Sequence, residues 1–166
     1  MECLVFSYGS NLYLPRLLSR VGKAQFVSIA VLPDYQLSFR KLGRDGSGKA
    51  TVSKQKNQVV WGSVCALSQD AKRLLDRCEG IGLHYVEQGV EVFTPEGQTL
   101  SVFTYQAASH KIQEGLKPFH WYKQYLLKGG ELLNLPTFYQ QQLVQMDSIP
   151  DHDAERAQLH QLVVKK

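Results

Sequence analysis

CLVFSYGSNL, residues 3–12, joins a short apolar run to a group of turn-forming residues. The apolar run is typical of a buried β-strand, and the Gly-Ser-Asn that follows is typical of a loop. Asn11 is suited to cap a helix, and the residues that predict this helix and its end are Leu14, Leu17, Leu18, Val21 and Gly22. We therefore expect a strand, a loop and a helix in succession. Backbone N–H groups of the loop and of the helix start would point toward a bound molecule.

The rest of the chain is richer in strands before residue 110 and in helices after it. Predicted strands cover residues 26–32, 35–39, 50–52, 59–67, 85–93 and 99–105, and predicted helices cover residues 71–78, 119–128 and 137–146. Pro33-Asp34 is read as a turn between two strands, and Gly129-Gly130 as the end of a helix. This order predicts an α+β fold in a single domain, with a mixed twisted sheet or small β-barrel and flanking helices. We assign residues 1–146 to the domain and residues 147–166 to a C-terminal tail that forms a short helix or frays.

Composition limits the class of protein without indicating its chemistry. The chain has 166 residues, 43% of them hydrophobic, and a formal net charge of +4. No apolar run approaches the roughly 20 residues that cross a bilayer, and the N-terminus does not resemble a secretory signal. Lysine and arginine are dispersed along the chain rather than clustered, so we expect no nucleic-acid partner and no membrane association. The three cysteines, Cys3, Cys65 and Cys78, are expected to be reduced thiols of a cytoplasmic protein.

Several segments that resemble phosphate-binding, metal-binding or nucleophile motifs lack residues that those motifs require. Residues 43–49, GRDGSGK, match the spacing of a phosphate-binding loop, but Ala50 replaces the required Ser or Thr. The residues that follow predict a strand, whereas phosphate binding needs a helix start there, so we interpret this segment as a hairpin loop. The five histidines show no metal-ligand spacing, and Cys78 has no nucleophile signature. We expect neither a metal nor a cofactor.

Two features remain as candidates for an active site. The first is the loop at residues 8–12, which by itself could be an ordinary strand-to-helix turn. The second is Glu79, which is followed by Gly80 and lies at the end of a predicted helix. A carboxylate at that place is more often solvated, yet in a dry pocket it is suited to general acid–base chemistry.

Together the two features resemble the γ-glutamylcyclotransferase family. The resemblance extends from about residue 4 to residue 130 and includes the strand VWGSV at residues 60–64. It implies that Glu79 is the catalytic carboxylate and that Tyr122, in PFHWY at residues 118–122, is a binding tyrosine ahead of the small pair Gly129-Gly130. Phe119 stands where the family has serine, and the segment between Glu79 and Tyr85 is one residue shorter than the family pattern. The substrate-binding residues implied or suggested as pocket walls are Tyr8, Gly9, Ser10, Asn11, Leu12, Tyr85, Tyr105 and Tyr122.

The reaction that the resemblance implies is cleavage of a γ-glutamyl amide to 5-oxoproline and a free amine. The substrate's own α-amine attacks its γ-carbonyl, and Glu79 would move the proton. The expected partner is a small anionic γ-glutamyl substrate, and a homodimer is a possible assembly. Two alternatives stay open: an enzyme of the same chemistry acting on γ-glutamylamines or deprotecting a biosynthetic intermediate, and a non-catalytic binding module on the same fold.

Overall fold

The computed structural model describes residues 2–164 of the chain, with the side chains of residues 2–161. Within this range the strands close into a barrel in the order β1-β3-β2-β4-β5. The strands are β1 (Glu2–Ser7), β2 (Gln25–Leu42), β3 (Gly48–Ser68), β4 (Tyr85–Phe93) and β5 (Thr99–Ala107). Neighbouring strands are antiparallel except at the seam between β1 and β5, where Val5 and Phe103 pair in parallel. The predicted α+β class and the small barrel are confirmed.

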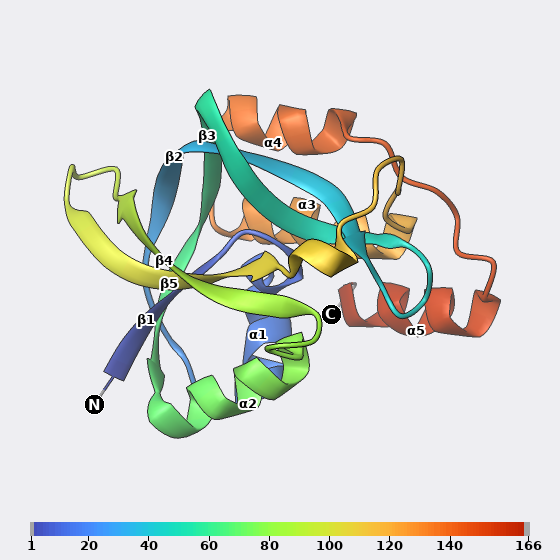
Figure 1. The fold of residues 1–166 in the computed structure, drawn as a ribbon, viewed down its shortest axis with the longest axis horizontal. Helices are drawn as coiled ribbons and strands as arrows, with labels where there is room; N and C mark the ends of the chain where they lie inside the picture. The colour runs from blue at the N-terminus through green and yellow to red at the C-terminus, as the bar shows by residue number, and fades with distance from the viewer. Residues whose placement is uncertain (1, 165–166) are drawn as a thin grey trace.

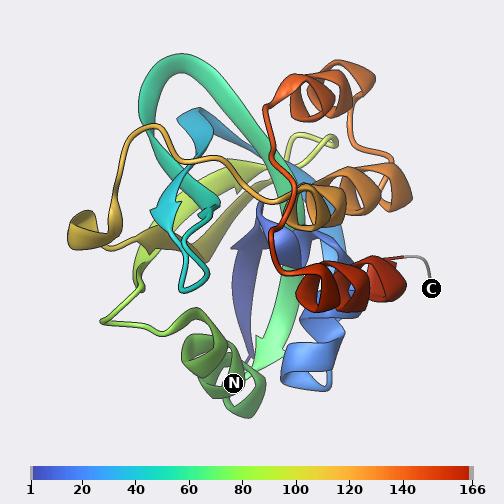
Figure 2. The ribbon, with the colours of Figure 1, turned by 90° about the vertical axis from the view of Figure 1, so that its right-hand side faces the viewer.

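Helices cover one end and one side of this barrel. They are η1 (Ser10–Leu12), α1 (Leu14–Val21), α2 (Gln69–Glu79), η2 (Ser109–Lys111), α3 (His120–Leu132), α4 (Thr137–Gln145) and α5 (Ala154–Val164). Figure 1 shows α1 and α2 together at one end of the barrel. Figure 2 shows α3, α4 and α5 on one side, with α5 next to α1. None of the helices in the described range is both long and apolar enough to span a membrane.

β1 is buried on both faces, which explains why its sequence is an apolar run. Val5 packs in a cluster with α1 and α2 residues, including Leu17 and Leu75. Phe6, on the opposite face, packs in the larger cluster, which includes Val64 and the helix α3 residues. Successive side chains of a strand point to opposite faces, so one strand contributes to both cores. The end of β1 is therefore held between two packed layers.

The prediction of a turn at Pro33-Asp34 is wrong, because β2 and β3 are two long continuous strands of one hairpin. Asp34 has φ 57° and Asn57 has φ 64°, and the pairing register shifts between Pro33 and Tyr35. The Asn57 N–H donates a hydrogen bond to Asp34 Oδ1 at 2.9 Å. The turn-forming residues thus form a β-bulge that bends the strand without ending it. Residues 43–47 connect the two strands, and Gly48 begins β3, so the hairpin-loop interpretation of this segment is confirmed.

The prediction that Gly129-Gly130 ends a helix is wrong, because helix α3 continues to Leu132. A Cβ at Gly129 would lie 2.6 Å from the carbonyl carbon of Leu12 and 2.7 Å from the nitrogen of Tyr13. The glycine therefore allows α3 to lie directly against the backbone of the η1 loop. At Gly130 the nearest atom would be 3.6 Å away, so that position has ordinary space.

In the described part of the C-terminal tail, helix α5 follows a non-helical segment at residues 147–153 and packs against α3. The His160 ring stacks on Trp121 with centroids 3.8 Å apart. Trp121 Nε1 also donates to Asp151 at 2.7 Å. Residues 165–166 of the predicted tail lie outside the described range. The three cysteines are free thiols, as predicted.

Candidate active site

A cavity opens where β1 ends, between the barrel and the C-terminal end of α2. Its empty volume is about 350 Å³, including the part that is open to solvent. It is lined by Phe6, Ser7, Tyr8, Gly9, Ser10, Asn11, Ala50, Glu79, Tyr85, Thr104, Tyr105 and Tyr122. All of the predicted site residues except Leu12 lie in this lining. Leu12 is fully buried in the core, beneath Gly129 of α3.

The loop that follows β1 is fixed by close packing on both sides. Gly62, in the VWG strand, leaves room for the Phe6 ring, which would lie 2.7 Å from a Cβ there, and for the Ser7 carbonyl. A Cβ at Gly9 would lie 3.0 Å from the Cβ of Ala50. The Leu12 N–H donates to the Gly9 carbonyl at 3.0 Å. Among residues 2–164, no hydrogen bond uses the N–H groups of Gly9, Ser10 or Asn11, which leaves donors at the cavity wall.

Glu79 is joined to this loop through its side chain. Asn11 Nδ2 donates to Glu79 Oε1 at 2.8 Å, and Arg20 donates to the same oxygen at 2.8 Å. Arg20 also donates to Asn11 Oδ1 at 3.0 Å, so the three side chains form a closed set. The Glu79 side chain is 13% exposed. The two donors hold one oxygen of the carboxylate in a fixed position beside the loop.

These contacts correct one prediction and add one residue. Asn11 does not cap the following helix, because α1 begins after Tyr13 without a side-chain cap and the Asn11 amide is used on Glu79. Arg20 was missed by the sequence reasoning. Arg16 and Arg20 lie one helical turn apart on α1, and this spaced pair of cations directly after the loop was the available signal.

Helix α2 positions Glu79 as its last residue. Ser68 caps the start of the helix by accepting from the Ala71 N–H at 3.1 Å. Gly80 ends it with φ 65°, a left-handed conformation that glycine adopts without strain. Near the same end, Asp76 accepts a hydrogen bond from Tyr105 at 2.6 Å, which ties α2 to strand β5. The position of Glu79 is therefore fixed by the cap at the start of α2, by Gly80 at its end and by the contact of α2 with strand β5.

Four tyrosines surround the carboxylate: the Tyr105 hydroxyl binds Asp76, as described above, and the other three hydroxyls bind the backbone. Tyr85 donates to the Ala50 carbonyl at 3.0 Å, and Tyr122 accepts from the Ala50 N–H at 3.1 Å. Tyr8 donates to the Tyr105 carbonyl. Burial raises the pKa of each of these four phenols, so they stay neutral. Glu79 is the one carboxylate in the described lining of the cavity.

A second and wider cavity, which we call the antechamber, adjoins the first and shares four of its walls: Ser10, Glu79, Tyr85 and Tyr122. Its empty volume is about 730 Å³, including open solvent. Its other lining residues are Arg16, Arg20, Lys41, Gly43, Arg44, Asp45, Lys49, Cys78, His84 and Trp121. Helix α1 and the β2–β3 connection, both of which contribute to this lining, lie on the side of the molecule that faces the viewer in Figure 2. No group of three or more metal-ligating side chains occurs in the described part of the chain.

Comparisons with known proteins agree on one family. The model of the AIG2-like family matches residues 59–143. A γ-glutamylcyclotransferase from Bos taurus is 33% identical over 147 residues, which are 84% of this chain and 76% of that protein. A solved structure of a γ-glutamyl cyclotransferase is 27% identical, with a TM-score of 0.87 and 100% of both chains covered. A solved structure of an uncharacterized protein from Homo sapiens is 28% identical, with a TM-score of 0.89 and 99% of both chains covered.

Proposed function

Because the chain belongs to the γ-glutamylcyclotransferase family of enzymes, we propose that it cleaves γ-glutamyl amides by ring closure to 5-oxoproline and a free amine. The observation that carries this proposal is the joining of Glu79 to the loop at residues 8–12. Their side chains meet at 2.8 Å in a cavity whose other titratable lining groups are neutral tyrosines. One carboxylate beside a loop of backbone donors suits a substrate that brings its own nucleophile.

In the proposed mechanism, Glu79 accepts a proton from the substrate's α-ammonium group. The freed amine attacks the γ-carbonyl carbon and forms the five-membered ring. The carbon–nitrogen bond to the leaving group then breaks as the protonated Glu79 returns the proton to that nitrogen. The ring nitrogen gives up its second proton to Glu79, and the released amine takes that proton up and leaves as an ammonium ion. Protons thus balance within each turnover, and no covalent bond to the enzyme forms. The reaction as written uses no cofactor.

The loop supplies the complementary electrophilic side of the site. The N–H groups of Gly9, Ser10 and Asn11 lie at the cavity wall without an acceptor among the described residues. They are suited to bind either the oxyanion that forms at the γ-carbonyl or the carboxylate of the γ-glutamyl group. Each such donor is typically worth about 3 kcal/mol in the transition state.

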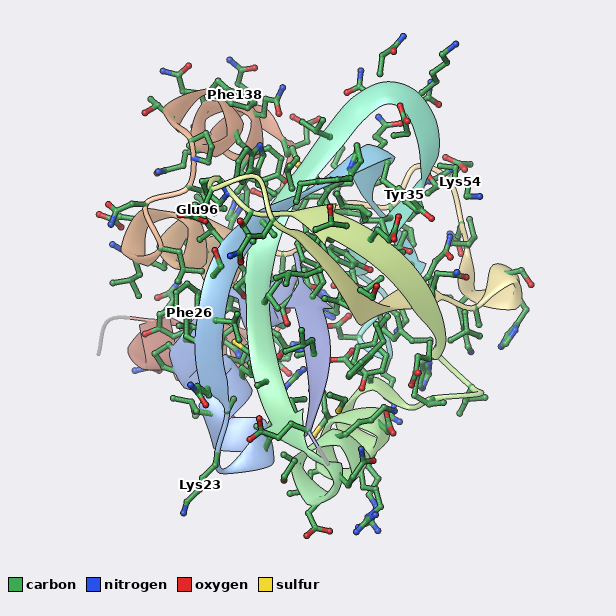
Figure 3. All side chains as sticks on the ribbon, turned by 90° about the vertical axis from the view of Figure 1, so that its left-hand side faces the viewer. Lys23, Phe26, Tyr35, Lys54, Glu96 and Phe138 are labelled. Carbon is green, nitrogen blue, oxygen red and sulfur yellow. The ribbon has the colours of Figure 1, made fainter. Side chains whose placement is uncertain are left out.

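The test is Glu79→Gln, assayed for 5-oxoproline release from γ-glutamyl-alanine. We expect the rate to fall by about 10²- to 10⁴-fold, since the amide is not an effective proton acceptor. A thermal shift caused by 5-oxoproline should persist in the variant, because the amide still accepts from Asn11 and Arg20. The matched control is Glu96→Gln in the exposed β4–β5 turn, labelled in Figure 3, which should retain wild-type activity.

Wild-type turnover by Glu79→Gln would contradict the role of the base. A thermal shift with γ-glutamyl compounds but no turnover by the unaltered protein would instead indicate a binding module. Turnover of γ-glutamylamines in place of γ-glutamyl amino acids would identify the alternative enzyme of the same chemistry.

A further inference from the structure

The antechamber begins where the proposed scissile bond would lie, because Glu79 belongs to both cavities. If the γ-glutamyl group fills the inner cavity, the leaving group must extend into the antechamber. The side chains there, rather than the loop at residues 8–12, face the part of the substrate that differs between γ-glutamyl compounds. The charges of the antechamber therefore bear on substrate choice.

The antechamber contains more cations than carboxylates. Its lining includes five basic side chains, Arg16, Arg20, Lys41, Arg44 and Lys49, against two acidic ones, Asp45 and Glu79. Both carboxylates already have partners: Arg20 binds Glu79 at 2.8 Å and Lys49 binds Asp45 at 2.7 Å. In the described part of the chain, Arg16, Lys41 and Arg44 are left without a carboxylate.

Of the three, Lys41 gives the strongest indication of a site for an anion. The residue is only 5% exposed, yet no ion pair forms with it among the described residues. Its ammonium lies over the Tyr85 ring, 5.0 Å from the centroid. Burial, followed by the repulsion of Lys49, lowers the pKa of Lys41 to about 8. A buried cation without an anion is costly, and a bound anion would remove that cost.

Arg16 presents a second cationic group from a different element. Its guanidinium lies 4.3 Å from the centroid of the Tyr125 ring, and its Nε is buried without a hydrogen-bond partner among residues 2–164. Arg44 lines the same cavity from the loop between β2 and β3, where its Nε donates to His84 at 3.1 Å. Two separate parts of the lining thus offer cations without a carboxylate: α1, and the end of β2 with its loop.

We propose that the antechamber selects a leaving group with two carboxylates, that is, an acidic amino acid joined to the γ-glutamyl group through its α-nitrogen. One carboxylate binds Lys41 with Arg44, and the other binds Arg16. This inference rests on the proposed function and adds the substrate class. Ring closure is unchanged, and the acidic amino acid leaves with the proton from Glu79.

The first test compares three substrates that share the γ-glutamyl group. These are γ-glutamyl-glutamate, its neutral isostere γ-glutamyl-glutamine, and γ-glutamyl-n-butylamine, which has no carboxylate on the leaving side. We expect kcat/KM to fall at least tenfold at each step in that order, mainly through KM. Equal kcat/KM for the glutamate and glutamine conjugates would overturn the inference and leave the proposed function intact. Absence of turnover on all three would overturn the proposed function and the inference with it.

The second test removes the cations. Lys41→Met should lower kcat/KM for γ-glutamyl-glutamate at least tenfold, whereas Lys41→Arg should retain most of it. Arg44→Gln, at an exposed loop position that is not expected to affect folding, should reduce the preference for glutamate over glutamine. The matched control is Lys54→Met on β3, which changes the same charge at the periphery of the molecule (Figure 3) and should leave the preference unchanged.

A pH series distinguishes a charge effect from a structural one. The ratio of kcat/KM for the glutamate and glutamine conjugates cancels the titration of the substrate amine, which both share. This ratio should fall as the pH rises through about 8, where Lys41 loses its proton in the free enzyme. A ratio that stays constant from pH 7 to pH 9 would contradict the role of Lys41.

Discussion

Arg20 is the cation that fixes the Glu79 carboxylate toward the loop. It donates to both Glu79 and Asn11, so it positions two residues of the site without lining the inner cavity. Arg20 is therefore a positioning residue for the proposed reaction.

Arg20→Gln should lower kcat/KM by about ten- to a hundredfold, since a hydrogen bond to a charged group is worth about 1.5–3 kcal/mol. Arg20→Lys should recover part of this loss, because an ammonium at that position can still donate to the carboxylate. Arg73→Gln, an exposed charge change on α2, is the control and should leave kcat/KM unchanged. An equal loss of activity in Arg20→Lys and Arg20→Gln, with reduced stability in both, would indicate that Arg20 only supports the structure.

At this scale the sequence predicted part of the candidate site. Glu79 and the loop at residues 8–12 carry recognisable motifs, because each lies within one short segment of the chain. Arg20 has no such motif: its role depends on α1 packing beside α2, and that packing is not visible in local spacing. Leu12 was assigned to the substrate loop because it belongs to the YGSNL motif of the resemblance, and its side chain lies in the core.

The contact between α3 and the η1 loop depends on the missing side chain of Gly129. Because the neighbouring atoms belong to the backbone of Leu12 and Tyr13, they cannot move aside as a flexible side chain would. The helix thereby braces the loop from behind. A change in packing at this helix surface should therefore also change the geometry of the loop at residues 8–12.

Gly129→Ala should destabilise the protein by about 1–3 kcal/mol through overpacking and should lower activity by displacing the loop. Gly130→Ala is the matched variant, with ordinary space, and should gain up to about 1 kcal/mol from helix propensity. Urea denaturation and 5-oxoproline release measure the two effects. Equal stability of the two variants would contradict the close contact.

The elements that were predicted wrongly share a cause. Asp34 and the Gly129-Gly130 pair have the chemistry of turns and helix ends, and local reasoning reads them so. Their actual roles come from distant partners: Asp34 meets Asn57, which lies 23 residues away, and Gly129 meets the loop after β1. Elements whose local turn and cap residues do end them, such as α2 at Gly80 and the β4–β5 hairpin, were predicted well.

Across the whole molecule, α5 links the C-terminal segment to the antechamber. Its His160 stacks on Trp121, which lines that cavity, and hydrogen-bonds with Tyr125 at 2.9 Å. Burial lowers the pKa of His160 to about 4, followed by the repulsion of Arg16, Lys49 and Arg156, while Asp151 acts in the opposite direction. His160 is therefore neutral when α5 is docked.

Acidification should weaken the docking of α5. The pKa of His160 is about 4 in the fold and near 6.5 when exposed, so the unfolded form binds more protons between these values. Stability from this group is complete above about pH 6.5 and falls as the pH drops toward 4, by on the order of 2 kcal/mol. Hydrogen exchange of the α5 amides measures the loss, and His160→Gln should flatten it. The same pH dependence in that variant would exclude His160 as its source.

The parallel seam between β1 and β5 has a kinetic consequence. Tyr8 and Thr104 both make hydrogen bonds across it, to the Tyr105 carbonyl and, at 2.8 Å, to the Phe6 carbonyl, joining positions nearly 100 residues apart. Bringing such distant segments together costs chain entropy that shorter contacts do not, so the seam is expected to close late in folding. The inner cavity takes its walls from both sides of this seam. A chain in which this seam is still open therefore lacks one wall of the cavity, and a molecule that binds in the cavity should favour closure of the barrel.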